Sequence, residues 1–288
     1  MSAGSPFVPP QTVLITGGAS GIGRATAELF LARGWKVAIA DLNEETATKM
    51  LEEVDAGDAL GFIRTDVRDE AQIVAAVTYV RERFGAIGCM CNNAGLGGAF
   101  GPLTEIEAED WDFTFEVLVR GPFLGIKHAA RAMREQGLGG SIVNTGSTGA
   151  LGAGLSPQAY TTAKSAIFGL TRAAAIELAD DRIRVNTVNP GTIATPLTSP
   201  TYDMELGKAF QKALPWPDQG LPEDIARAIF FFADQDSGFI TGEMINVDGG
   251  MIANGPMAGL APAVGGPTSV VGVNRGMTGE KSEVRRRL

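Results

Sequence analysis

The sequence has little of what metal sites and disulfide scaffolds use: its 288 residues include two cysteines and one histidine. A structural metal site usually needs about four such ligands, so Cys89 and Cys91 lack the partners to complete one. Two positions apart in a strand, they would point to the same face, and we interpret them as buried thiols. We therefore expect no bound metal, and sparse cysteine fits a reducing compartment.

Positive charge is also scarce, with 24 lysines and arginines against 33 aspartates and glutamates, a formal net charge of −9. Such a chain repels phosphate backbones and anionic lipid. No apolar run approaches the ~18 residues of a membrane span, and the start, MSAGSPFVPPQ, shows no secretory signal pattern. We expect a soluble, cytoplasmic protein with a small-molecule partner, no nucleic acid and no membrane.

Hydrophobic residues make up 44% of the chain and form short apolar runs that alternate with helix-length segments. Strands are predicted at 12–16, 36–41, 60–65, 86–91, 141–146, 183–188 and 243–247, and helices at 22–33, 43–55, 69–84, 109–136, 157–180 and 222–233. Strands separated by helices pair in parallel through right-handed crossovers. The predicted fold class is α/β: a single-domain, Rossmann-like, doubly wound parallel sheet with helices on both faces.

Three segments depart from this alternation. Residues 1–10 form an N-terminal leader before the Rossmann-like domain, which spans 11–251, and residues 252–288 form a C-terminal extension after it. The Gly, Pro and Ala content of the extension is typical of a disordered tail. Within the domain, 192–220 carries four prolines and is too long for a plain connection, so we predict that it is a substrate lid.

Glycines at 17, 21 and 23 follow the first predicted strand, in the stretch TGGASGIG. Without a Cβ, such residues let backbone N–H groups approach a pyrophosphate, whose charge the next helix N-terminus stabilises. Asp41 ends the second strand, where a carboxylate would accept hydrogen bonds from an adenosine ribose and repel a 2′-phosphate. This favours NAD over NADP. Alternatively, Asp41 only caps the helix that begins near Asn43.

A serine, a tyrosine and a lysine lie in the nearly chargeless stretch TGSTGALGAGLSPQAYTTAKS, residues 145–165. Tyr160 and Lys164 are four apart on a predicted helix and share one face. Tyrosine ionises near pH 10, so a base near neutrality needs a pKa lower by about three units, which a nearby ammonium and an oxidised nicotinamide can supply. Tyr160 would take the hydroxyl proton while hydride leaves the same carbon, and Ser147 would hydrogen-bond the substrate oxygen.

Together, the motifs resemble the short-chain dehydrogenase/reductase family. They are TGGASGIG at 16–23, NNAG at 92–95, a serine thirteen residues before YTTAK, NPGTIATP at 189–196 and DGG at 248–250. The resemblance implies an NAD-preferring enzyme with catalytic Ser147, Tyr160 and Lys164, in which Asp66 meets the adenine. The cofactor site that it implies consists of Gly17, Ser20, Gly21, Ile22, Gly23, Asp41, Leu42, Asp66, Val67, Asn93, Ala94, Gly95, Tyr160, Lys164, Pro190, Gly191, Ile193 and Thr195.

One position departs from the family pattern. The family carries an Asn three residues before a Gly on the long helix, and here Leu118 stands three before Gly121. Because Pro122 has no N–H, an α-helix would leave the carbonyl of Leu118 free. In the family that carbonyl is thought to hold the water through which the lysine reaches solvent. Our hypothesis is that the proton path survives the loss of the Asn side chain.

Few charges lie in the segments expected around the nicotinamide, which favours an apolar secondary alcohol or its ketone, such as a terpenoid, steroid or cyclic alcohol. Two alternatives are a carbonyl reductase working in the reverse direction and an NAD(H)-sensing interaction protein with impaired turnover. The single histidine, His128, has no partner acid in the pattern and is interpreted as a helix-surface or interface residue. The resemblance also implies a homo-oligomer, a tetramer or dimer, built through helices 109–136 and 157–180.

Overall fold

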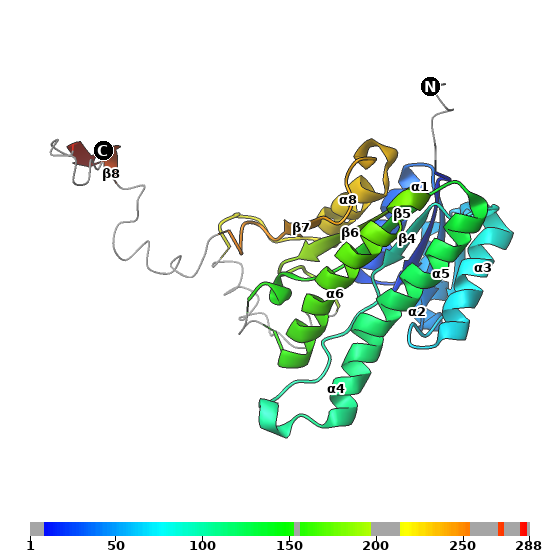
Figure 1. The fold of residues 1–288 in the computed structure, drawn as a ribbon, viewed down its shortest axis with the longest axis horizontal. Helices are drawn as coiled ribbons and strands as arrows, with labels where there is room; N and C mark the ends of the chain where they lie inside the picture. Colours follow the sequence, from blue (N-terminus) through cyan, green and yellow to red (C-terminus); the bar gives the residue numbers. More distant parts are fainter. Residues whose placement is uncertain (1–8, 153–155, 197–213, 254–269, 274–282, 287–288) are drawn as a thin grey trace.

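Seven of the apolar runs form one parallel sheet, with the strand order β3-β2-β1-β4-β5-β6-β7 (Figure 1). The structure is a computed structural model that describes residues 9–152, 156–196, 214–253, 270–273 and 283–286. The strands of the sheet are β1 Thr12–Thr16, β2 Lys36–Asp41, β3 Leu60–Arg64, β4 Cys89–Asn92, β5 Gly140–Thr145, β6 Ile183–Pro190 and β7 Met244–Val247. This order confirms the predicted doubly wound, Rossmann-like sheet.

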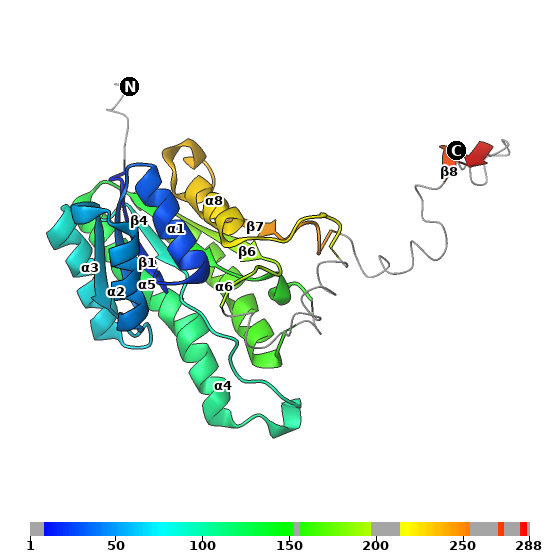
Figure 2. The same ribbon diagram turned by 180° about the vertical axis from the view of Figure 1, so that it is seen from behind.

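Helices cover both faces of the sheet (Figure 2). Those on one face are α1 Gly21–Ala32, α2 Glu44–Val54 and α8 Pro222–Ala233. Those on the other are α3 Glu70–Phe84, α5 Gly121–Gln136 and α6 Gln158–Glu177, with α4 Ala108–Phe115 leading into α5. The short 3-10 turns are Gly57–Ala59, Leu103–Glu105, Thr148–Ala150, Ala179–Asp181 and Gln235–Ser237.

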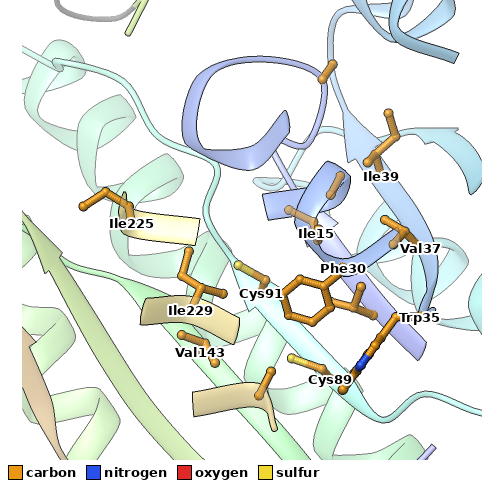
Figure 3. Packing of buried hydrophobic residues seen from close by; sticks show 14 of the residues in the cluster. Ile15, Phe30, Trp35, Val37, Ile39, Cys89, Cys91, Val143, Ile225 and Ile229 are labelled. Carbon is orange, nitrogen blue, oxygen red and sulfur yellow. The ribbon is translucent and has the colours of Figure 1, made fainter. Parts of the chain in front are cut away.

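The apolar core on the α1 and α8 face is built around Phe30 (Figure 3). Its ring is fully buried and meets Trp35 and Phe230 edge to face, with centroids 4.9 and 5.0 Å away. Cys89 and Cys91 also point into this core as free, buried thiols, which confirms their sequence interpretation. Burial raises the pKa of Cys89 to about 12, so this thiol stays protonated and unreactive near neutral pH.

The predicted helix 109–136 is interrupted in the middle by a π-helical turn, Glu116–Arg120, between α4 and α5. There the N–H of Gly121 donates to the carbonyl of Glu116, five residues back instead of four. Pro122 explains the change, because it has no N–H and its ring would meet the carbonyl of residue 118 in a regular α-helix. A single wide turn absorbs the mismatch without breaking the helix.

Parts of the predicted leader, lid and extension lie outside the described residues: 1–8, 197–213, 254–269, 274–282 and 287–288. Within the extension, β8 Val270–Val273 and β9 Glu283–Arg286 form a separate antiparallel pair. The sequence pattern does not indicate these strands, because glycine and proline are frequent in the surrounding residues. In the part of the chain that the structure describes, no helix is both long and apolar enough to cross a membrane.

Candidate active site

The carboxyl ends of β1, β4, β5 and β6 border a cleft of about 390 Å³. It lies at the switch point of the sheet, where β1 pairs with both β2 and β4 and the connections diverge. Every predicted cofactor-binding residue except Gly23 lines this cleft, and Ser147 lines it too. The structure therefore brings together at one edge residues that are spread over most of the chain.

The glycine turn after β1 has the shape that a pyrophosphate site requires. Gly17 has a φ of +63°, and a Cβ there would lie 2.8 Å from the Cα of Ala94. A Cβ on Gly23 would lie 2.0 Å from the carbonyl oxygen of Gly17, so Gly23 packs α1 on the turn instead of lining the cleft. Ser20 makes no side-chain cap to α1, whose first turn carries no acidic residue. The helix N–H groups thus suit an anion.

Asp41 is held in place at the end of β2 by two backbone N–H groups. Its Oδ2 accepts from the N–H of Ala19 and its Oδ1 from the N–H of Asn43, each at 3.0 Å. The helix cap that we had considered for Asp41 belongs instead to Asn43, whose side chain accepts from the N–H of Thr46 at 3.0 Å. The Asp41 carboxylate therefore lines the cleft and does not cap α2.

Ser147 follows β5, and its Oγ accepts a hydrogen bond from the N–H of Gly149 at 3.0 Å. That contact uses an acceptor lone pair and leaves the single hydroxyl hydrogen for a substrate oxygen. Lys164 lies on α6 one turn after Tyr160, with its Nζ 5.7 Å from the centroid of the tyrosine ring. The same Nζ donates to the carbonyl of Thr145 at 2.7 Å. The three predicted catalytic side chains thus line the same cleft.

Lys164 is 5% exposed, and this burial lowers its pKa to about 8, because the charged form loses hydration. Leu118 is buried beside it, packed in a cluster with Val67 and Ala163. A Cβ built on Gly95 would lie 3.4 Å from Cδ2 of Leu118 and 4.0 Å from Nζ of Lys164, so the two side chains flank that glycine. Leu118 thus places beside the ammonium an apolar side chain, which cannot form hydrogen bonds with it or with water.

Several cleft residues are absent from the sequence prediction. Most of them directly precede or follow a predicted site residue in the sequence, so the predicted segments already indicate them. Phe113 on α4 and Val117 in the π-helical turn are the exceptions, because only the tertiary structure brings these two residues to the cleft. The additional lining residues are Ala40, Thr65, Arg68, Leu96, Phe113, Val117, Thr145, Gly146 and Pro196.

His128 lies on α5 outside the cleft, and the structure gives it an acid partner that the sequence pattern does not show. Its side chain is 10% exposed, and Nε2 lies 2.8 Å from Oε1 of Glu70, which also pairs with Lys127. The acid partner escaped the sequence analysis because Glu70 begins α3, far from α5 in sequence. Among the described residues, no group of three or more His, Cys, Asp or Glu side chains could hold a metal ion.

A Rossmann-like sheet with a glycine turn and a Ser-Tyr-Lys set at its carboxyl edge defines a class of nucleotide-binding oxidoreductases. Residues 17–252 match the family model described as enoyl-(acyl carrier protein) reductase. The solved structure of a short-chain type dehydrogenase/reductase from Mycobacterium ulcerans is 33% identical, with a TM-score of 0.80, and covers 90% of this chain and 96% of that one. The chain belongs to the short-chain dehydrogenase/reductase family.

Two further relatives bear on function. (+)-Borneol dehydrogenase 2 of Salvia officinalis is 35% identical over 255 residues, which cover 83% of this chain and 88% of that protein. The structure of 3-ketoacyl-(acyl-carrier-protein) reductase from Brucella melitensis, complexed with NADH, is 33% identical with a TM-score of 0.78. The match covers 83% of this chain and 97% of that one.

The buried ammonium gives a stability prediction. The pKa of Lys164 is about 8 in the native state and has its ordinary value of 10.5 in the unfolded chain. Between these pH values, Lys164 is therefore protonated in the unfolded chain and neutral in the native state. The free energy of unfolding should therefore rise with pH there, by about 2 kcal/mol from pH 7.5 to 10, relative to Lys164→Met. Urea unfolding of both proteins at the two pH values measures it; a constant difference would contradict the assigned pKa.

Proposed function

We propose that this chain is an NAD-dependent dehydrogenase that interconverts an apolar secondary alcohol and its ketone. The observation that carries the proposal is that Ser147, Tyr160 and Lys164 line the same cleft as the glycine turn and Asp41. In the proposed complex, the pyrophosphate of the dinucleotide lies at the N-terminus of α1 and its adenosine ribose lies at Asp41. The nicotinamide end then extends toward the catalytic side chains. Hydride transfer requires this arrangement, in which the nicotinamide lies next to the alcohol and to the side chain that takes its proton.

The side chains divide the chemistry between them. NAD supplies the acceptor for the hydride that leaves the carbinol carbon. The Ser147 hydroxyl donates to the substrate oxygen, and Tyr160 removes the proton from that oxygen as the C=O bond forms. The Lys164 ammonium, 5.7 Å from the tyrosine ring centroid, favours the phenolate that this step requires. The products are the ketone, NADH and one proton, which Tyr160 holds first.

The choice of NAD over NADP rests on two charges. The fixed Asp41 carboxylate would accept hydrogen bonds from ribose hydroxyls and repel a 2′-phosphate. Arg24, the cation nearest to the turn in sequence, bonds Glu28 at 2.7 Å and Glu53 at 2.8 Å. These acids neutralise the guanidinium, so it is a poor phosphate ligand. The solved relative complexed with NADH is consistent with this choice.

The substrate class follows from the lining beside the catalytic side chains. Leu96, Val117 and Ile193 give the cleft apolar walls. An alcohol without charge avoids burying an unpaired carboxylate or ammonium against them. The name of the relative from Salvia officinalis specifies borneol, an apolar cyclic secondary alcohol. We therefore propose a terpenoid, steroid or cyclic alcohol, and the same site would also reduce the ketone under excess NADH.

We also propose a homo-oligomer, dimer or tetramer, formed through α4, α5 and α6. Large apolar side chains on these helices remain solvent-exposed in the single chain, among them Phe123 at 46% and Ile176 at 80%. Covering them with a second copy would remove apolar area from water. Static light scattering at micromolar concentration should give a multiple of the 30.1 kDa chain mass, and a monomer would contradict this assignment.

The test of the proposed activity is NADH formation by the purified protein from NAD and a panel of apolar secondary alcohols. We expect turnover with at least one alcohol. In Tyr160→Phe, kcat should fall by about a thousandfold or more, because the acid/base group is gone. The wild-type protein should prefer NAD over NADP by about tenfold or more. Tight NADH binding with no turnover in either direction would instead favour an NAD(H)-sensing protein.

The Leu118 position gives a separate kinetic prediction. If the main chain near this residue is sufficient for the proton path, Leu118→Asn should change turnover by less than about tenfold, since it adds only a polar side chain beside Lys164. The measurement is kcat on the best alcohol across pH, with Leu118→Ala as a control for lost packing. A gain of about a hundredfold or more in Leu118→Asn alone would mean that the natural enzyme is impaired.

A further inference from the structure

A backbone contact joins the two described ends of the predicted lid, 192–220. Ile193 forms an isolated parallel bridge with Gly220, and the N–H of Ala194 donates to the carbonyl of Gly220 at 3.1 Å. Ile193 follows β6, which lies on the opposite side of β1 from β2 and Asp41. In the proposed complex the adenosine ribose lies at Asp41, so Ile193 borders the nicotinamide end of the cleft.

Gly220 lies on the other side of Ile193 from the cofactor. A second hollow, of about 530 Å³, has Ile193, Gly220, Trp216 and Val247 in its lining. Ile193 therefore lines both the cleft and this hollow, whereas Gly220 lines the second hollow and not the cleft. The Ile193 side chain is 5% exposed and belongs to the buried cluster on the α1 and α8 face. It forms the wall between the two spaces.

The end of the Ile193 side chain occupies space that only a glycine at 220 leaves open. A Cβ built on Gly220 would lie 2.6 Å from Cδ1 of Ile193 and 3.3 Å from the carbonyl oxygen of Thr192. Carbon atoms in contact are about 3.5 Å or more apart, so Cδ1 would have to move away from residue 220. Because Gly220 borders the second hollow, that movement is toward the cleft.

The backbone itself does not require glycine at this position. Gly220 is not among the glycines with a positive φ, so an alanine there adopts the same conformation without strain. The atom that its methyl group meets first is the end of a flexible side chain, which can move without unfolding the protein. The requirement for glycine therefore comes from the position of Ile193.

We propose that Gly220 is a positioning residue for the nicotinamide of the bound cofactor, because its missing Cβ keeps Cδ1 of Ile193 out of the space that the nicotinamide needs. The proposal rests on the proposed dinucleotide site and adds to it a residue that lies outside the cleft. A side chain at 220 would move the Ile193 wall and narrow the cleft at the nicotinamide end. The adenosine and pyrophosphate positions would keep their shape.

The experiment compares NADH with ADP-ribose, which lacks only the nicotinamide ring, by calorimetric titration. In Gly220→Ala, NADH binding should weaken by about tenfold, the size expected when one methyl group is forced into a packed site. ADP-ribose binding should weaken by less than about twofold, which also shows that the variant is folded. A merely structural role would weaken both ligands equally, so an unchanged ratio of the two Kd values overturns the proposal.

A double variant tests whether Gly220 acts through Ile193. Ile193→Val removes Cδ1, the atom that a Cβ at residue 220 would meet. When Ile193→Val is already present, adding Gly220→Ala should weaken NADH binding by less than about twofold, because the two changes are coupled through one contact. If Gly220→Ala still costs about tenfold in that background, the residue does not act through Ile193 and the proposal fails.

The matched control is Gly169→Ala, which adds the same methyl group at an exposed position of α6. Among the described residues, a Cβ there would meet no atom within 4 Å beyond the backbone of its own helix. Both Kd values should stay within about twofold of wild type. If wild-type protein binds neither NADH nor ADP-ribose, it is the proposed function that fails. If it binds both and Gly220→Ala keeps their ratio, only the role of Gly220 is wrong.

Discussion

The site depends on how the ends of three central strands are tied together at the switch point of the sheet. The hydroxyl of Thr16, at the end of β1, accepts from the N–H groups of Asn93 and Ala94, each at 3.1 Å. The side chain of Asn93 donates back to the carbonyls of Thr16 and Gly17, and Thr145 on β5 donates to its Oδ1. These bonds hold the glycine turn, the NNAG segment and the end of β5, which leads to Ser147, at fixed separations.

A buried positive charge is the main electrostatic feature of this arrangement. Lys164 has lost most of its hydration, and its Nζ donates to the carbonyl of Thr145 at 2.7 Å, so the strand that leads to Ser147 also holds the ammonium. Leu118 adds an apolar neighbour, which strengthens electrostatic interactions nearby but also favours the neutral amine. Burial of the Lys164 ammonium lowers the stability of the folded protein. In the proposed mechanism, the same burial places a positive charge near Tyr160.

Two carboxylates that line the cleft, those of Asp41 and Asp66, are held in different ways. Asp41 accepts hydrogen bonds from the backbone N–H groups of Ala19 and Asn43, which fix the direction of its carboxylate. Asp66 is held by a guanidinium that also rests on an aromatic ring, so its charge is largely compensated. In the proposed complex with NAD, the carboxylate of Asp41 would discriminate against a 2′-phosphate by repulsion.

The sequence by itself determined the features that depend on local pattern. Alternating apolar runs predicted the strands and helices, and the spacings of the glycines and of Ser147, Tyr160 and Lys164 indicated a nucleotide-dependent oxidoreductase. Only the tertiary structure decided the contacts between segments distant in sequence: the stacking of Arg68 on Phe113, the pairing of His128 with Glu70, and the burial of Leu118 beside Lys164. Periodicity reports which face of an element is buried, but not which side chain of another element meets it.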